Sequence, residues 1–259
     1  MNDILNKQEI EAGINDSNSI NCQVFGEVDS TNTRMKENVY DGIYDYNLIV
    51  SDTQSMGRGR RGRVFESPKG TGIYMSLLIP VNDKRDNVLL ITSAAAVAVV
   101  RAIRDMTDLK PVIKWVNDIY VDGLKVCGIL AEAVSNKAGE MYVILGIGIN
   151  VTTKIEALGE NARNIAGALF DGVAPVARNE IISAVVNEFY EIYNNISDRE
   201  YMSDYRKYSM VIGKNVRYSS NEGWVEGKAL DIDNDGGLIV EADGKRLTLN
   251  TGEITLRLR

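Results

Sequence analysis

The residues whose chemistry is easiest to name form one short run, Gly57-Arg58-Gly59-Arg60-Arg61-Gly62-Arg63. Glycine leaves a backbone free to adopt positive φ and to approach a ligand closely. Arginine offers a planar, permanently charged fork that matches carboxylate and phosphate oxygens. Four like charges in one loop repel one another, although the whole chain is acidic, with a formal net charge of -7. The run therefore predicts a loop that binds an anionic small molecule. A basic patch for nucleic acid and a solvated loop without a role are the alternatives.

A second polar stretch is Lys114-Trp115-Val116-Asn117-Asp118-Ile119, which Lys125 follows seven residues after Asp118. Asn117 and Asp118 offer oxygen ligands of the kind that Mg²⁺ prefers when substrate phosphates also hold it. A hairpin with Asp122-Gly123 at its turn would allow Lys125 to point back to the same place. The alternative is a polar turn with a snorkelling lysine.

The run Gly146-Ile147-Gly148-Ile149-Asn150 carries a weaker signal. Glycines within a strand indicate either close packing or a ligand that lies against the backbone. Asn150 would be the polar end of such a strand.

The elements that must position these residues follow from the apolar patterns. We expect a short helix or loose arm over residues 1 to about 20, and a chain that enters and leaves the arginine run on strands. Ser30 and Thr31 stand in a cluster of N-cap residues, 29–33, so simple capping of the next helix is an alternative to any ligand role for them. The predicted strands are 24–28, 47–51, 72–79, 111–115, 119–121, 124–134 and 141–151, and the predicted helices are 34–38, 88–103, 180–196 and 201–208.

From Gly213 onward the pattern changes to short strands separated by Asn, Asp and Gly turns. About five strands fit into this segment, which suggests a small SH3-like β-barrel that leans on the rest of the chain. The apolar runs before it predict a sheet with both faces largely covered, or with one face over a ligand. We therefore expect an α+β protein with a domain over residues 1–211 and a small β-domain over 212–259.

Composition excludes several classes of chemistry. The chain has no histidine, so Ser-His-Asp and Cys-His catalysis and the commonest transition-metal ligand are absent. Cys22 and Cys127 are too few for a disulfide framework, which favours a reducing, cytoplasmic setting. Residues 1–21 lack the apolar region of a signal peptide, and the longest apolar run, 88–100, is too short to span a bilayer.

Taken in order, these motifs closely resemble the catalytic region of biotin–protein ligases, also called biotin–[acetyl-CoA-carboxylase] ligases. The resemblance covers roughly residue 24 to the end. It rests on Asp29-Ser30-Thr31-Asn32, Gln54 with Gly57–Arg63, Ser67-Pro68, Lys114–Asp118, Lys125 with Gly128-Ile129-Leu130, Gly146–Asn150, and Gly252-Glu253-Ile254.

The resemblance implies a mixed-sheet catalytic domain flanked by helices, of the class II synthetase type, and a two-step reaction. In the family, the carboxylate of biotin attacks the α-phosphate of MgATP to give biotinyl-5′-AMP and pyrophosphate. A lysine of a biotin carboxyl carrier domain then attacks the mixed anhydride and releases AMP. Both steps develop negative charge on oxygen, so positioned cations and amides suffice without a side-chain nucleophile.

The same resemblance assigns roles to individual residues. Arg58, Arg60 and Lys125 are expected to be catalytic, with Lys125 neutralising the carboxylate and the α-phosphate as they meet. The residues expected to contact biotin are Ser30, Thr31, Asn32, Gln54, Gly57, Arg58, Gly59, Arg60, Lys125 and Gly128. The residues expected to serve ATP are Arg60, Arg63, Asn117, Asp118 and Asn150, with Asp118 as the Mg²⁺ ligand.

Two departures from the family pattern stand out. Val116 occupies a position where the family usually has proline, and loss of the fixed φ is expected to loosen the turn that presents Asn117 and Asp118. About 28 residues precede Asp29, fewer than the DNA-binding winged helix of many bacterial members needs, so we expect a ligase that is not a repressor.

Two other functions compete with biotin ligation. Lipoate–protein ligases share the broader fold and reaction type. A nucleic-acid-binding module is disfavoured by the acidic balance and by the lack of aromatic residues among the arginines. The implied partner is a biotin carboxyl carrier domain, with no DNA and no membrane; the sequence leaves the particular carrier and the choice of monomer or homodimer open.

Overall fold

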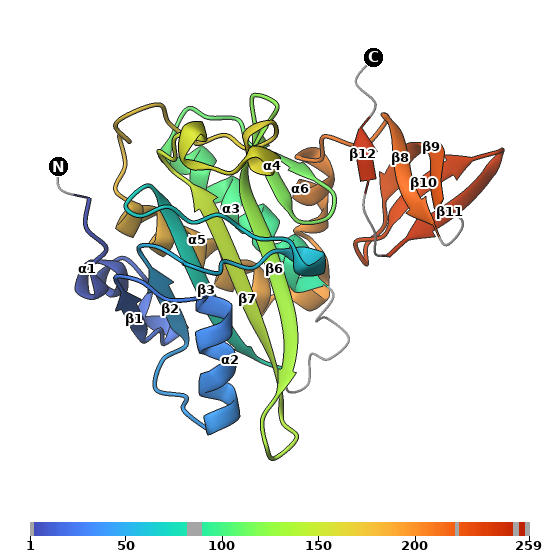
Figure 1. The fold of residues 1–259 in the computed structure, drawn as a ribbon. Coiled ribbons are helices and arrows are strands. Elements are labelled where there is room, and N and C mark those ends of the chain that lie inside the picture. The colour runs from blue at the N-terminus through green and yellow to red at the C-terminus, as the bar shows by residue number, and fades with distance from the viewer. Residues whose placement is uncertain (1–2, 82–89, 221–222, 251–253, 257–259) are drawn as a thin grey trace.

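The larger part of the molecule is built on a seven-stranded mixed sheet with the order β1-β2-β3-β7-β6-β5-β4 (Figure 1). The computed structural model describes residues 3–81, 90–220, 223–250 and 254–256. β1 and β2 are parallel, and the other neighbours are antiparallel. The strands are β1 (Cys22–Phe25), β2 (Leu48–Ser51), β3 (Gly72–Pro80), β4 (Val112–Lys114), β5 (Asp118–Val121), β6 (Leu124–Ser135) and β7 (Met141–Asn150).

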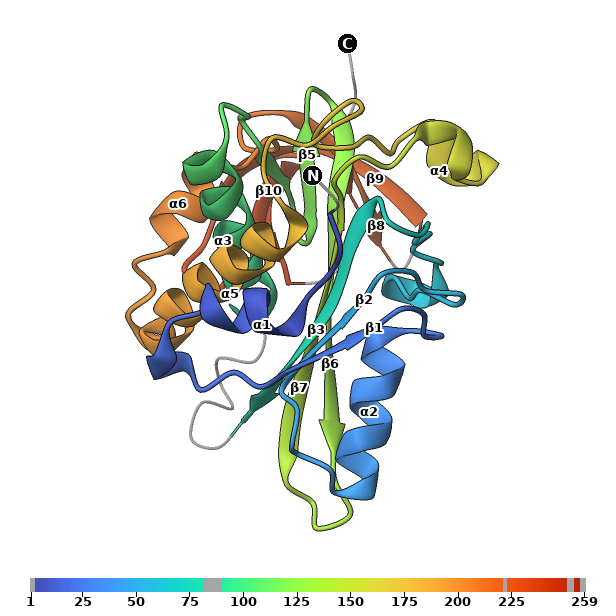
Figure 2. The ribbon, with the colours of Figure 1, turned by 90° about the vertical axis from the view of Figure 1, so that its left-hand side faces the viewer.

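Helices cover both faces of this sheet. α3, α5 and α6 lie on one face and α2 lies on the other (Figure 2). Burial on both sides explains why β3 and β7 are nearly continuous apolar runs instead of alternating ones. The prediction of a sheet with two covered faces is thereby confirmed. The helices are α1 (Lys7–Ala12), α2 (Thr31–Asp41), α3 (Ile91–Met106), α4 (Glu160–Arg163), α5 (Arg178–Asn194) and α6 (Met202–Lys207).

All four predicted helices differ from the observed ones at their ends, two of them by three residues and α5 and α6 by less. The helix predicted over 34–38 is longer, because α2 begins at Thr31 and continues to Asp41. The helix predicted over 88–103 begins at Ile91, and residues 88–89 lie outside the described residues.

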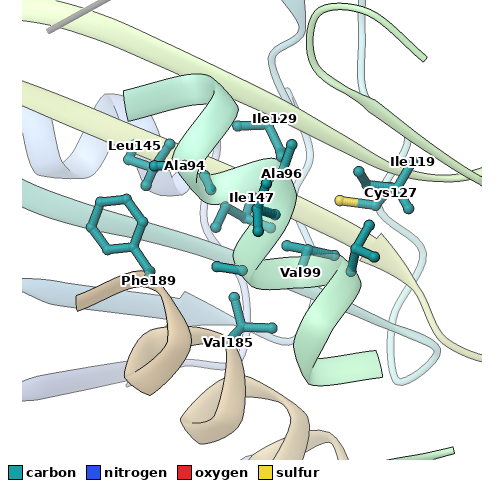
Figure 3. Packing of buried hydrophobic residues seen from close by; sticks show 14 of the residues in the cluster. Ala94, Ala96, Val99, Ile119, Cys127, Ile129, Leu145, Ile147, Val185 and Phe189 are labelled. Carbon is teal, nitrogen blue, oxygen red and sulfur yellow. The ribbon is translucent and has the colours of Figure 1, made fainter. Parts of the chain in front are cut away.

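The main core lies between the sheet and the pair α3 and α5. The alanines of α3 are fully buried, and their small side chains let the helix approach the strands closely (Figure 3). Val185 and Phe189 of α5 pack on the same helix, and burial of each contributes roughly 1.5–3 kcal/mol. This layer holds β6 and β7 rigidly from behind.

The predicted Asp-Gly hairpin is present between β5 and β6. Asp122 and Gly123 both have positive φ, 50° and 82°, as a type I′ turn requires. Lys125 pairs with Tyr120, which lies two residues from Asp118 and therefore on the same face of β5. The turn thus places Lys125 as a diagonal neighbour of Asp118.

The C-terminal segment forms a second sheet, antiparallel and five-stranded, with the order β11-β10-β9-β8-β12. It confirms the predicted small SH3-like β-domain, whose boundary at residues 211 and 212 stays a prediction. Gly252 and Glu253, part of the last motif, lie outside the described residues. Within the described ranges, no helix has the length and hydrophobicity to cross a membrane. The strands are β8 (Asn215–Ser220), β9 (Gly223–Ile232), β10 (Leu238–Ala242), β11 (Lys245–Leu249) and β12 (Ile254–Leu256).

Candidate active site

The predicted site residues surround a single cavity of about 810 Å³. Its walls come from the start of α2, the arginine loop (residues 57–65), the turn between β4 and β5, strands β6 and β7, and the segment around α4. The predicted residues that line it are Ser30, Thr31, Asn32, Gln54, Arg58, Gly59, Arg60, Arg63, Asn117, Asp118, Lys125, Gly128 and Asn150. The sequence motifs, far apart in the chain, are therefore brought together.

Gly57 is the one predicted residue that does not line the described cavity. A Cβ at this position would lie 2.1 Å from the carbonyl oxygen of Phe65 and 2.9 Å from Gln54 Nε2. The role of Gly57 is therefore to let the two ends of the arginine loop pass close to each other, and a direct contact with biotin is not supported.

Thr31, Asn32 and Gln54 of the cavity wall belong to a chain of hydrogen-bonded side chains, called here the polar floor, which continues outside the lining to Ser67 and Ser76. Ser76 Oγ lies 2.8 Å from Thr31 Oγ1 and 2.6 Å from Asn32 Oδ1. The backbone N–H of Thr31 donates to Gln54 Oε1 at 2.8 Å, and Gln54 Nε2 donates to Ser67 Oγ at 2.8 Å. Because these groups fix one another, the floor presents a preorganised polar surface.

Ser30 behaves differently from a capping residue. It occupies the N-cap position of α2, yet its side chain makes no capping hydrogen bond and is only 2% exposed. Thr31 lies within the helix, and its hydroxyl contacts Gln54 at 3.2 Å. The simple capping interpretation is therefore wrong for both residues.

The strand glycines accommodate side chains of the protein itself. A Cβ on Gly146 would lie 2.2 Å from Asn32 Oδ1, and a Cβ on Gly148 would lie 2.5 Å from the ring of Phe65. Gly128, paired with Gly148 across β6 and β7, also faces that ring at 3.2 Å. Close packing therefore explains these glycines. The sequence analysis missed Phe65, because only the register of β6 against β7 shows which glycines a neighbouring ring can cover.

Cationic and polar groups meet at another part of the cavity wall. Lys125 Nζ lies 2.7 Å from Asp118 Oδ1 across the hairpin, an approach that the predicted hairpin allowed without fixing the face that each residue uses. Arg60 Nη1 donates to Asn117 Oδ1 at 2.9 Å, and Asn117 Nδ2 donates to the carbonyl oxygen of Ile129 at 2.9 Å. The arginine loop, the turn before β5 and the hairpin thus converge on one place.

Asn150 contributes a buried acceptor to this cavity. Its Nδ2 donates to the carbonyl oxygen of Gly167 at 2.9 Å, whereas its Oδ1 is buried and has no hydrogen-bond partner among the described residues. An unsatisfied buried acceptor costs free energy that a ligand donor would recover.

Two hydrogen bonds to other parts of the chain restrain the turn that carries Val116. Tyr205 Oη of α6 donates to the carbonyl oxygen of Val116 at 3.0 Å. Trp115 Nε1 donates to the carbonyl oxygen of Gly236, in the turn between β9 and β10 of the C-terminal domain, at 2.9 Å. Tyr205 is fully buried, and this burial raises the pKa of its hydroxyl, which therefore stays a donor. These contacts restrain the turn that was expected to loosen without proline.

Glu132 was also missed by the sequence analysis. Its carboxylate on β6 accepts hydrogen bonds from Arg58 Nη2 at 2.8 Å and Asn32 Nδ2 at 2.9 Å. A lone glutamate in a strand gives no signal by itself, since its partners are 74 and 100 residues away.

No group of three or more His, Cys, Asp or Glu side chains within the described residues is placed to hold a metal ion. Asp118 offers one carboxylate at the cavity wall. One carboxylate fits Mg²⁺, which is commonly bound through one or two carboxylates together with substrate phosphates and water.

Comparisons with known proteins agree with this geometry. Residues 24–150 match the model of the biotin/lipoate A/B protein ligase family, and residues 211–257 match the biotin protein ligase C-terminal domain. The bifunctional ligase/repressor BirA of Bacillus spizizenii is 33% identical over 83% of this chain. The chain spans 67% of the length of that protein and 62% of the length of the Bacillus subtilis protein of the same name.

Two further matches cover nearly the whole of the compared proteins. The biotin–[acetyl-CoA-carboxylase] ligase of Mycobacterium tuberculosis is 29% identical over 89% of this chain and 87% of its own length. A solved structure of the biotin protein ligase of Aquifex aeolicus in complex with biotin and ATP has a TM-score of 0.75 and 28% identity. That match covers 92% of this chain and 98% of the other.

Proposed function

Because this chain belongs to the biotin protein ligase family, we propose that it activates biotin with ATP and transfers it to a lysine of a carrier protein. The observation that carries the proposal is the convergence of Arg60, Lys125 and Asp118 on one part of the wall of a cavity that is also lined by the preorganised polar floor. Such a cavity offers a place for a polar ring at the floor and for phosphates beside the cations.

In the first step, a carboxylate oxygen of biotin forms a bond to the α-phosphorus of ATP, and the bond to pyrophosphate breaks. Two anions must approach each other for this reaction. Lys125 exchanges its contact with Asp118 for the meeting oxygens, and Arg60 adds a second cation to the same wall. Positive charge that is already in place stabilises the transition state without reorganisation of solvent.

Asp118 would hold Mg²⁺ together with the ATP phosphates, and the ion would supply further neutralisation of phosphate charge. Asn150 Oδ1 would accept a hydrogen bond from the nucleotide, since it is buried and lacks a partner in the described part of the chain. Arg63, also on the cavity wall, is proposed to serve the phosphates.

In the second step, the amine of the acceptor lysine attacks the carbonyl carbon of the mixed anhydride. The bond to AMP breaks, an amide forms and the nitrogen loses a proton. No side-chain nucleophile is needed, in keeping with a chain that lacks histidine.

The polar floor favours biotin over lipoate. The ureido ring of biotin presents two N–H donors and a carbonyl acceptor, and Ser30, Thr31, Asn32 and Gln54 offer hydroxyl and amide partners. The dithiolane ring of lipoate has no such donors, so buried polar groups would lose their partners. Sites of this kind reject the analogue that lacks the hydrogen bonds.

We propose a biotin carboxyl carrier domain of a carboxylase as the acceptor. The name of the Mycobacterium tuberculosis relative, biotin–[acetyl-CoA-carboxylase] ligase, supports an acceptor of this kind. Binding to DNA is not proposed.

The test is to incubate the protein with biotin and MgATP, without acceptor, and to detect bound biotinyl-AMP by mass spectrometry. Lipoate is run in parallel, and Arg60→Ala is the comparison variant. Adenylate from biotin alone, weaker in the variant, is the expected result. Folded protein that forms no adenylate with either acid would refute the ligase assignment.

A further inference from the structure

We propose that Glu132 is a positioning residue that fastens the arginine loop to the polar floor of the cavity. One carboxylate oxygen, Oε1, lies 2.8 Å from Arg58 Nη2 in the loop. The other, Oε2, accepts from Asn32 Nδ2 at 2.9 Å. That the retained ligand is biotinyl-AMP rests on the proposed function. The attachment of the arginine loop through Glu132 does not depend on it.

Glu132 is well placed to act as a fixed point. Alternation along β6 puts Gly128, Leu130 and Glu132 on one face of the sheet. Gly128 and Leu130 line the cavity, and Glu132 lies two residues further along the same row, outside the lining. β6 is paired with β7 along most of its length and packs on the core, so the backbone that carries Glu132 is held in place. Arg58, by contrast, is on a surface loop.

The family resemblance assigned Arg58 to catalysis and to contact with biotin, whereas in the structure its side chain contacts Glu132. Its guanidinium bonds to a carboxylate of the sheet. The side chain of Glu132 is 24% exposed and that of Arg58 is 42% exposed, so the pair lies at the protein surface. A ligand that covers the pair would exclude water from it and thereby strengthen the contact.

The other end of the loop is tied to the same floor. Ser67 Oγ, the last member of the floor, donates to the carbonyl oxygen of Phe65 at 3.0 Å. The loop is therefore attached at Arg58 through Glu132 and Asn32, and at Phe65 through Ser67. Within the loop, Gly57 and Phe65 are also joined by a backbone hydrogen bond of 2.9 Å. A ligand that orders the floor thus stabilises the loop at both attachment points.

The first test needs no ligand. Trypsin cleaves after arginine, so Arg60, Arg61 and Arg63 report the opening of the loop, and the rate of cleavage follows the population of the open form. The matched control is Glu140→Gln. Glu140 is an exposed carboxylate in the turn that joins β6 to β7. Cleavage elsewhere in the chain and the melting temperature report global unfolding.

We expect Glu132→Ala to raise the rate of loop cleavage by about tenfold, since charge-assisted hydrogen bonds of this kind are lost. Glu132→Gln keeps one acceptor and is expected to give an intermediate rate, while Glu140→Gln matches the wild type. Wild-type cleavage rates in both Glu132 variants would overturn the proposal. If Glu132→Ala does not fold, Glu132→Gln decides the question.

The second test follows release of biotinyl-AMP from the purified complex. Glu132→Ala is expected to release it about tenfold faster and Glu132→Gln by a smaller factor, and both should raise the KM for biotin more than they lower kcat. The double variant Arg58→Gln/Glu132→Gln should release it no faster than the single ones, because the two residues act as a pair. Wild-type retention in the variants would overturn this part. A wild-type protein that forms no adenylate would refute the proposed function, whereas the trypsin comparison would still decide the role of Glu132.

Discussion

Lys125→Gln is expected to slow formation of biotinyl-AMP by about 10²–10³-fold while it leaves the protein folded. Removal of one preorganised group that stabilises transition-state charge costs about that much in kcat. The Nζ of Lys125 reaches across the hairpin to Asp118, and in the proposed mechanism it exchanges this contact for the two substrate anions as they meet.

The effect on stability is smaller and can be worked from the geometry. At 2.7 Å, the attraction between Lys125 Nζ and Asp118 Oδ1 is about 6 kcal/mol at an effective dielectric constant of 20. Much of this is offset by desolvation, because the side chains are only 26% and 22% exposed. The contact is an ion pair and not a hydrogen bond, since Asp118 Oδ1 has no hydrogen-bond partner among the described residues. A partly exposed ion pair contributes roughly 1 kcal/mol net or less, so the variant should lose about 1 kcal/mol or less of unfolding free energy.

The assay is biotin-dependent exchange of pyrophosphate into ATP, with urea unfolding as the measure of stability. Lys137→Gln is the control, because Lys137 is a largely exposed lysine in the turn between β6 and β7. An exchange rate for Lys125→Gln within about threefold of the wild type would refute the assigned role, since that corresponds to less than 1 kcal/mol of the barrier.

Three further predictions concern packing, the turn before β5 and the pH dependence of stability. Gly148→Ala should lower the free energy of unfolding by about 1–3 kcal/mol because its Cβ meets the ring of Phe65; in urea unfolding Gly26→Ala, with open space around it, should stay within about 0.5 kcal/mol. Equal effects would contradict the packing argument. Trp115→Phe should raise the KM for ATP about threefold to tenfold with little change in kcat, because the turn loses its bond to Gly236; an unchanged KM would show that this bond does not position the turn. Burial raises the pKa of four acids of the folded protein to about 12. Above about pH 9 the unfolded chain therefore releases protons that the folded chain keeps, and this destabilises the folded state. The urea concentration at the unfolding midpoint should be lower at about pH 10.5 than at about pH 8. An equal or higher midpoint at the higher pH would contradict this. The four acids are Cys22, Tyr120, Tyr190 and Tyr201.

Local patterns were sufficient for much of the fold. The Asp122-Gly123 turn follows from the requirement for two positive φ angles, and it pairs Lys125 with Tyr120, two residues from Asp118. The apolar runs of β3 and β7 indicate a sheet covered on both faces, as observed. In each case a short segment determines its own geometry.

The rest depends on register and on contacts between distant segments. The sequence does not show that Phe65 lies over Gly148, because that requires the pairing of β6 with β7 and the path of the arginine loop. The sequence likewise does not indicate a role for Glu132, because its partners Arg58 and Asn32 lie far from it in the chain. The N-cap signature at Ser30 was misleading, since α2 begins there without a capping side chain. The contact of Trp115 with the C-terminal domain joins segments 121 residues apart.

The most direct measurement of the central claim is transfer to an acceptor. The purified protein would be mixed with biotin, MgATP and a biotin carboxyl carrier domain, and the modified residue would be located by mass spectrometry, with a carrier whose acceptor lysine is replaced by arginine as the control. The account predicts one biotinylated lysine in the intact carrier, none in the control, and none when lipoate replaces biotin. A folded protein that leaves the intact carrier unmodified, or that attaches lipoate equally well, would contradict it.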